Sequence, residues 1–278
     1  MKGTLYVVAT PLGNLGDLTY RAVELLKVVP VVAAEDTRRT RQLLNHIEAH
    51  PRLISFHAHS NQSRLDEIVA ELERGRDVAL VSDAGTPVVS DPGAELVAEV
   101  RRRGYRVIPI PGLTAVATAL SASGLTADRY LFLGFIPRKG KERSQLLERA
   151  ARDQWSVVFY EAPNRLADLL SDLEHVAGPD REVVVARELT KLHEEIRTGT
   201  LAELAGFYSA HEARGEITVI LAGSAEPAAS PAVTVDIEQR ATELLAGGVS
   251  RKDTVQRLVE ESGLPRNEVY RRVMDLPR

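Results

Sequence analysis

Residues 81–93 read Val81-Ser-Asp-Ala-Gly-Thr-Pro-Val-Val-Ser-Asp-Pro-Gly93 and follow the apolar run Val78–Val81. A short apolar run that stops at Ser-Asp-Ala-Gly predicts a buried parallel strand ending in a tight loop, where open α/β sheets bind ligands. Gly85 lets backbone approach a bound molecule, and Asp83 supplies a carboxylate. Asp91 and Pro92 predict the N-cap and first residue of a helix over Pro92–Arg103. Taken alone, these residues also describe an ordinary strand-to-helix turn.

Two further loops have the same character. Thr10–Asp17 follows the first apolar run, and Ile108–Ala115 follows another, and both are rich in glycine and proline. The carboxyl ends of parallel strands lie at one edge of a sheet. We therefore expect the three loops to converge on one crevice.

Composition is that of an ordinary globular protein. The 278 residues are 44% hydrophobic and 27% charged, which allows two domains with real cores. The absence of cysteine excludes disulfides, thiolate catalysis and cysteine-ligated zinc. No apolar stretch is long enough to cross a bilayer and no signal peptide precedes the first strand, so we expect a cytoplasmic protein without membrane contact.

Apolar runs alternate with helical periodicity along most of the chain. This alternation predicts an α/β fold of two domains with mostly parallel sheets, followed by a small helical module. Gly124–Asp128 is the expected hinge. The expected parts are an N-terminal α/β domain at 1–123, a C-terminal α/β domain at 124–224, a Pro- and Ala-rich linker at 225–232, and a helix-turn-helix-like module at 233–278.

The carboxy-terminal segment carries an excess of positive charge. Val249–Arg278 holds seven Arg or Lys against five Asp or Glu, giving +2 within a chain of formal charge −4. Three short helical patterns there resemble a helix-turn-helix, which favours nucleic-acid binding over a dimerisation or docking role. The net negative charge of the whole chain gives no support of its own to nucleic-acid binding.

Motifs for nucleotides and metals are missing. Gly13–Gly16 has the wrong spacing for a dinucleotide loop, and Gly134–Glu142 lacks the Walker spacing and its Ser or Thr. His57 and His59 share one side of a strand without a third ligand. We therefore expect no metal site.

Seven motifs in order resemble those of the tetrapyrrole methylase superfamily, and most closely its bacterial branch that acts on ribosomal RNA. They span about residues 4–222, and the carboxy-terminal helices match that branch too. The motifs are Thr10-Pro-Leu-Gly-Asn-Leu-Gly-Asp-Leu18, Glu35-Asp-Thr-Arg-Arg-Thr40, Ser82-Asp-Ala-Gly-Thr-Pro87, Pro111-Gly-Leu-Thr-Ala115, Gly134-Phe-Ile-Pro-Arg-Lys139, Phe159-Tyr-Glu-Ala-Pro-Asn-Arg165 and Arg187-Glu-Leu-Thr-Lys191.

This resemblance implies an activity and its partners. It implies 2′-O-ribose methylation of a cytidine in the decoding region of 16S ribosomal RNA, with S-adenosyl-L-methionine as methyl donor. It also implies a homodimer that acts on the small ribosomal subunit, with the cofactor between the two α/β domains. The cofactor contacts fall on Pro11, Leu12, Asp83, Gly85, Thr86, Thr114, Ala115, Tyr160, Glu161, Ala186 and Arg187.

The catalytic and RNA-binding residues are argued from charge and position. Glu188 and Lys191 are our candidates for orienting the nucleophile: Lys191 would lower the pKa of the hydroxyl, or Glu188 would accept its proton. An equally good reading is a surface pair or a domain contact; Glu35, Asp36 and His57 are further candidates. The predicted RNA contacts are Arg38, Arg39, Arg138, Lys139, Lys141 and Arg271, with Arg41 and Arg143 beside them.

Two competing functions remain at this point. A methyltransferase of the same fold could act on a porphyrin-like macrocycle or a protein histidine, but it would have no use for the carboxy-terminal helices. A ligand-sensing DNA-binding regulator would instead read an operator with its helix-turn-helix, for which only Arg266, Asn267 and Arg271 are suitable.

Overall fold

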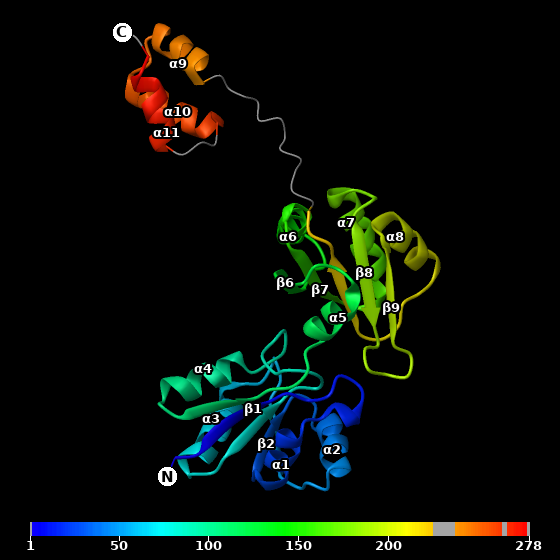
Figure 1. Ribbon diagram of the computed structural model, residues 1–278. Coiled ribbons are helices and arrows are strands. Elements are labelled where there is room, and N and C mark those ends of the chain that lie inside the picture. The colour runs from blue at the N-terminus through cyan, green and yellow to red at the C-terminus, as the bar shows by residue number, and fades with distance from the viewer. Residues whose placement is uncertain (1, 225–236, 263–265, 277–278) are drawn as a thin grey trace. The chain divides into compact units, whose positions relative to one another are not determined.

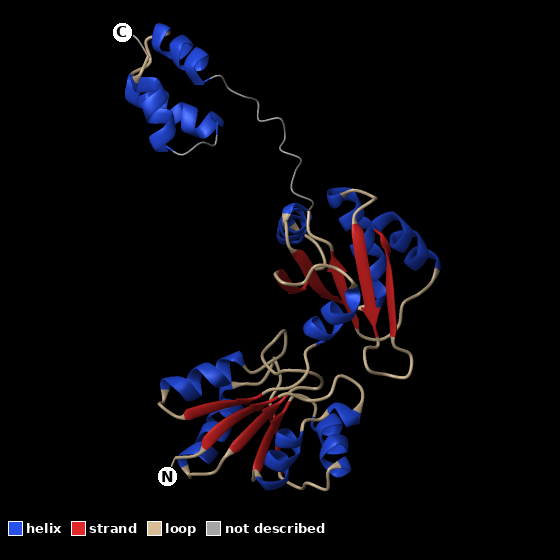
Figure 2. Cartoon of the chain, in the orientation of Figure 1, coloured by secondary structure: helices blue, strands red, loops and turns tan. Residues whose placement is uncertain are grey.

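The computed structural model describes residues 2–224, 237–262 and 266–276. The chain forms two compact units, Met1–Ser224 and Ala225–Arg278, each considered by itself. The first unit contains two five-stranded sheets with helices around them (Figures 1 and 2). No helix of the described ranges is long and apolar enough to span a membrane.

The first sheet is entirely parallel, as predicted, and has the strand order β3-β2-β4-β1-β5. Its apolar side chains alternate between two clusters, because successive residues of a strand face opposite sides. Helices α1 and α2 cover one face, and α3 and α4 cover the other. The elements are β1 (Thr4–Val8), η1 (Leu15–Asp17), α1 (Tyr20–Val28), β2 (Val31–Ala34), α2 (Thr37–His46), β3 (Arg52–Ser55), α3 (Gln62–Glu73), β4 (Val78–Val81), α4 (Ala94–Arg102) and β5 (Arg106–Ile110).

The predicted start of the helix after β4 is wrong. Helix α4 begins at Ala94, its N-cap is Gly93 with φ 125°, and no side chain caps it. The loop before it bends sharply, since Val88 (φ 77°) and Ser90 (φ 62°) have left-handed backbone. This bend turns the Asp91 side chain into a cavity instead of toward the helix amides.

The second sheet has the order β6-β7-β10-β8-β9 and is mostly antiparallel, so the expected mostly parallel sheet is wrong for this half. Only β6 and β7 pair in parallel. Residues 188–194 between β8 and β9 are too few for a parallel crossover, so these strands form a hairpin. The elements are β6 (Tyr130–Phe135), α6 (Lys141–Arg152), β7 (Ser156–Glu161), η2 (Pro163–Arg165), α7 (Leu166–Ala177), β8 (Glu182–Arg187), β9 (Glu195–Thr200), α8 (Leu201–Ala210) and β10 (Ile217–Leu221).

Helix α5 (Ala115–Ser123) follows the first sheet in the chain but packs against the second. Its Val116, Ala119 and Leu120 form a cluster with side chains of β7, β8 and β10, whereas α6, α7 and α8 cover the opposite face. Leu12 from the first loop joins the same cluster. Thus α5 belongs to the expected N-terminal domain by sequence and to the second sheet by packing, and Leu12 connects the two halves.

The second unit is a three-helix bundle of α9 (Ile237–Ala246), α10 (Arg251–Ser262) and α11 (Arg266–Met274). Its apolar core contains Ile237, Ala241, Val255, Leu258, Val269 and Val273. At the start of α10, the Asp253 amide donates to the Ser250 hydroxyl at 3.2 Å, which caps the helix. The expected linker at 225–232 lies outside the described residues.

Truncating Leu120 tests the packing of α5. Leu120 is 6% exposed, and Leu120→Ala is expected to lower the free energy of unfolding by about 2–5 kcal/mol, through lost transfer energy and a residual cavity. Urea unfolding followed by circular dichroism measures this change. The matched control is Val28→Ala in α1, which is 76% exposed and is expected to stay within about 0.5 kcal/mol of the wild type. Equal effects of the two substitutions would contradict the packing described.

Candidate functional site

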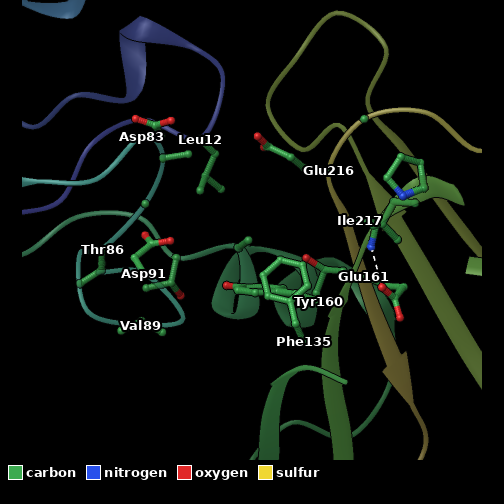
Figure 3. Close-up of a pocket in the computed structure, with 18 of the residues that line it drawn as sticks. Leu12, Asp83, Thr86, Val89, Asp91, Phe135, Tyr160, Glu161, Glu216 and Ile217 are labelled. Carbon is green, nitrogen blue, oxygen red and sulfur yellow. Dashed lines mark hydrogen bonds between the residues drawn. The ribbon is translucent and has the colours of Figure 1, made fainter. Parts of the chain in front are cut away.

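A cavity of about 300 Å³ lies between the two sheets of the first unit (Figure 3). Side chains and backbone from both halves line it, which is the usual position of small-molecule sites at domain interfaces. The lining residues are Leu12, Glu35, Asp83, Ala84, Gly85, Thr86, Val89, Asp91, Thr114, Ala115, Phe135, Tyr160, Glu161, Ala162, Pro163, Gly215, Glu216, Ile217 and Thr218.

The three glycine- and proline-rich loops of the first half meet at this cavity, which confirms their predicted convergence. The Thr10 amide donates to the Gly85 carbonyl at 2.8 Å, and the Gly85 amide donates to Thr10 at 3.1 Å. The Thr86 hydroxyl donates to the Leu113 carbonyl at 3.0 Å, which ties in the third loop. Gly85 has φ 79°, a conformation that favours glycine.

The lining is acidic on the side of the first sheet. Asp83 accepts a hydrogen bond from the Asp36 amide at 3.0 Å and pairs with Arg39 at 3.5 Å. Burial and the charge of Asp83 raise the pKa of Glu35. Burial raises the pKa of Asp91 to about 6, with Glu35, Asp83 and Glu216 adding to the shift. Carboxylates that raise each other's pKa are stabilised by a bound cation, so this wall suits a positively charged ligand.

The opposite wall is aromatic and contains one deeply buried carboxylate. The Tyr160 ring lies 4.9 Å from Phe132 and 5.6 Å from Phe135, and burial raises the Tyr160 pKa to about 12. Glu161 pairs with Arg165 at 3.1 Å and accepts from the Ala162 amide at 2.8 Å. Burial raises the pKa of Glu161.

Lys191 links the loop between β8 and β9 to both halves. Its ammonium contacts Glu188 at 2.9 Å and Glu216 at 3.3 Å, and its aliphatic chain crosses Gly13 so closely that a Cβ there would lie 2.2 Å from the Lys191 Cγ. The hydrogen bond from Lys191 lowers the pKa of Glu188. Burial acts to lower the Lys191 pKa, but Glu188 and Glu216 outweigh it and raise the pKa. The pair is therefore held as ammonium and carboxylate.

Comparison with known proteins identifies the family. The family model of tetrapyrrole (corrin/porphyrin) methylases matches residues 4–205. The chain belongs to this family. The resemblance seen in the sequence is thereby confirmed.

Relatives in this family match nearly the whole chain. "Ribosomal RNA small subunit methyltransferase I" of Synechocystis sp. is 44% identical and covers 99% of this chain and 98% of its own length. The protein of the same name from Escherichia coli O157:H7 is 40% identical, over 99% of this chain and 96% of its own.

Solved structures share the fold. Uroporphyrin-III C-methyl transferase from Thermus thermophilus, complexed with S-adenosyl homocysteine, has a TM-score of 0.59 at 21% identity and covers 79% of this chain and 97% of its own. The methyltransferase CobJ has a TM-score of 0.61 at 19% identity and covers 80% and 95%.

Most of the residues expected to contact the cofactor line the cavity, and three lie elsewhere. Pro11 lines a neighbouring cavity of about 370 Å³ together with Leu12, Asp83 and Arg39. Arg187 lines a separate cavity of about 200 Å³ and forms an ion pair with Glu195. Ala186 is fully buried beneath α5. The predicted cofactor contacts that do line the cavity are Leu12, Asp83, Gly85, Thr86, Thr114, Ala115, Tyr160 and Glu161.

The expected catalytic and RNA-binding residues lie outside the lining of this cavity. Glu188 and Lys191 are outside its lining but contact it through Glu216. Arg38 is exposed and paired with Asp36 at 2.7 Å. The other exposed members are Arg39 on α2, Arg138, Lys139 and Lys141 after β6, and Arg271 on α11 of the second unit. The expectation for Arg143 is wrong, because its side chain is buried and pairs with Asp172 at 2.6 Å.

Val89, Asp91 and Phe135 line the cavity but were absent from the expected site. Asp91 belongs to the stretch Val81–Gly93, but its Asp-Pro-Gly context indicated a helix cap. Phe135 lies in the motif Gly134–Lys139, which indicated the family but gave no function for the Phe135 ring. The described residues contain no group of three His, Cys, Asp or Glu that could hold a metal ion.

Two substitutions test the assignment of the cavity to a cofactor. Asp83→Ala removes a carboxylate, and Gly85→Val places a branched side chain at φ 79°, where even a Cβ would lie 3.3 Å from Leu12. Each is expected to weaken cofactor binding by roughly 100-fold or more in calorimetry while circular dichroism stays unchanged. Asp66→Ala, an exposed carboxylate on α3, is the control. Unchanged affinity in both cavity variants would contradict the assignment.

Proposed function

We propose that this chain transfers a methyl group from S-adenosyl-L-methionine to the ribose 2′-oxygen of a cytidine in the decoding region of 16S ribosomal RNA. The observation that supports this most strongly is the acidic and aromatic cavity enclosed by both halves of a chain whose full-length relatives carry a ribosomal RNA methyltransferase name. The comparison favours RNA over a macrocycle or a protein histidine, because likeness to the tetrapyrrole enzymes near 20% identity concerns the fold alone.

The residues that line the cavity match the chemical groups of the cofactor. S-adenosyl-L-methionine carries a sulfonium, an ammonium, a carboxylate and a flat adenine, and it supplies an activated methyl group. Asp83, Glu35 and Glu216 provide negative charge for the cationic groups. Thr114 and Ala115 stand at the start of α5, where the helix N-terminus suits a carboxylate. Leu12 and the aromatic wall at Tyr160 offer apolar cover for a ring.

Lys191 and Glu188 have separate roles in this reaction. The raised pKa keeps Lys191 protonated, so its ammonium orients the nucleophilic hydroxyl and stabilises negative charge that develops on the oxygen. Glu188 holds the ammonium through the 2.9 Å contact. Because its own pKa is lowered, Glu188 is a weak proton acceptor.

The substrate is a folded polyanion, and the exposed basic residues neutralise its backbone. Arg38 and Arg39 extend from α2 near the Asp83 wall, and Arg138, Lys139 and Lys141 follow β6 on the other half. Arg271 adds a contact from the helical unit. The enzyme acts in the cytoplasm as a homodimer on the small ribosomal subunit.

Mass spectrometry of ribosomal RNA tests this function. Cells without the protein are expected to lack one ribose methyl group in their small-subunit RNA, and purified protein with S-adenosyl-L-methionine is expected to restore it on subunits from those cells. Porphyrin-type macrocycles serve as the competing acceptor. An unchanged set of ribose methyl groups, or transfer only to the macrocycle, would overturn the proposal.

Removing the helical unit tests its contribution to RNA binding. Deleting 233–278 is expected to weaken binding to ribosomal RNA while leaving cofactor affinity intact, because the cofactor cavity lies wholly within the first unit. Filter binding at several salt concentrations, with calorimetry for the cofactor, measures both affinities. Equal RNA affinity after the deletion would give these helices a structural role only.

A further inference from the structure

One edge of the cavity is formed by a loop with unfavourable backbone. Val88 has φ 77° and Ser90 has φ 62°, and left-handed backbone is a genuine outlier for a β-branched residue. Packing holds it there: Val88 lies against the apolar core of the first sheet, and its Cγ2 is 3.3 Å from where a Cβ on Gly93 would be. Such strain persists where surrounding structure enforces it, and it clusters at functional sites.

A bulge in β6 meets this loop from the other half of the unit. The register of β6 with β7 shifts between Phe132 and Gly134, and Gly134 has φ 62°. A Cβ on Gly134 would lie 2.9 Å from the Ser90 hydroxyl oxygen, so only glycine allows this approach. Bulges redirect side chains beside active sites, and here the next residue, Phe135, lines the cavity.

The approach of Gly134 to Ser90 places Val89 and Phe135 at one apolar edge, which faces both the cavity and the solvent. Phe135 is 56% exposed and Val89 is 39% exposed, although both line the cavity. Tyr160 supports Phe135 from behind at 5.6 Å (Figure 3). An exposed aromatic ring with a rigid neighbour suits stacking of an unpaired nucleobase. The exposed Arg138, Lys139 and Lys141 follow Phe135 closely and suit the flanking phosphates.

Asp91 follows directly on this edge and, like Glu35 but unlike the other three carboxylates that line the cavity, it forms no ion pair with a described side chain. Asp83 is paired with Arg39, Glu161 with Arg165, and Glu216 with Lys191. Among the described residues, Asp91 has no cationic side chain within 4.0 Å, and Figure 3 shows it between Thr86 and the Tyr160 ring. The groups that face it are the Glu35, Asp83 and Glu216 carboxylates and the Ser82 and Tyr160 hydroxyls.

We propose that this edge is the subsite for the acceptor nucleotide, where Phe135 and Val89 hold the base and the Asp91 carboxylate accepts the 2′-hydroxyl proton. The proposal rests on the function proposed above. In the step, the 2′-oxygen forms a bond to the methyl carbon as the carbon–sulfur bond breaks, and that electron pair stays on sulfur. The hydroxyl proton passes to Asp91, so the sulfonium becomes a neutral thioether and the carboxylate a neutral acid.

The environment of Asp91 gives the reaction a pH dependence. Its pKa is raised to about 6 by burial and by the facing carboxylates, which makes it a better proton acceptor than an ordinary aspartate near neutral pH. Only the ionised form can accept the proton, so kcat rises with pH through this pKa and levels off above it. A cation bound beside Asp91 lowers the pKa, which puts the midpoint at or below about 6.

The test of Asp91 is a pH profile of kcat on small ribosomal subunits from cells lacking the protein. Asp91→Asn is expected to lower kcat by about 100- to 10,000-fold and to remove the acidic limb, while the calorimetric Kd for S-adenosyl-L-methionine rises by no more than about 10-fold. Glu35→Gln, another cavity carboxylate, is expected to retain the limb. Loss of the limb in Glu35→Gln but not in Asp91→Asn would overturn the role of Asp91, as would a loss of cofactor affinity in Asp91→Asn as large as its loss of kcat.

The test of the base subsite separates KM from kcat. Phe135→Ala is expected to raise KM for the subunit by roughly 5- to 100-fold, with cofactor Kd unchanged, because one stacking contact is lost. Phe135→Tyr is expected to restore KM. The control is Tyr20→Ala, since Tyr20 is an exposed aromatic outside the cavity lining. An unchanged KM in Phe135→Ala would overturn the subsite.

Failure of this inference differs from failure of the proposed function. If wild-type protein methylates the subunit and the Asp91 and Phe135 variants do so equally well, the function stands and the subsite is wrong. If wild-type protein transfers no methyl group to the RNA, the function itself is wrong.

Discussion

The reciprocal backbone hydrogen bonds between Thr10 and Gly85 are the constraint on which the site depends. They form an isolated antiparallel bridge between loops that leave two adjacent parallel strands, β1 and β4. Both backbone groups are thereby satisfied in a region with little room for water. The bridge also fixes Leu12, whose side chain enters the cluster between α5 and the second sheet. One pair of backbone contacts thus orders the first loop and joins the two halves.

Charge separation follows from this arrangement. Carboxylates from the first sheet and from the segment before β10 face the cavity, whereas arginines and lysines project from α2 and from the loop after β6. A cationic methyl donor and an anionic RNA require opposite fields within one small volume. Burial strengthens the electric field of the cavity carboxylates, whereas the field of the exposed arginines and lysines stays sensitive to salt.

The mixed second sheet contributes residues of β6, β7 and β10 to the cavity lining. Because β10 inserts between β7 and β8, the segment Gly215–Thr218 at its start reaches the cavity beside Tyr160 and Glu161. Gly215 allows Glu188 to lie against the backbone there, since a Cβ would be 1.9 Å from its carboxylate. Strand order therefore brings the Lys191 pair, on the loop between β8 and β9, into contact with Glu216 of the cavity lining.

The sequence determined the existence and type of nearly every element, the parallel first sheet and the convergence of its loops. These features depend on local signals: apolar runs, helical spacing, and glycine or proline at strand ends. Tertiary structure decided the direction of β8, β9 and β10, because an apolar run reports burial and not orientation. It also decided that α5 packs on the second sheet, and that Asp91 faces a cavity instead of capping α4. That last outcome depends on the left-handed backbone of Val88 and Ser90, and the packing of Val88 against the core of the first sheet is a long-range contact that no local pattern encodes.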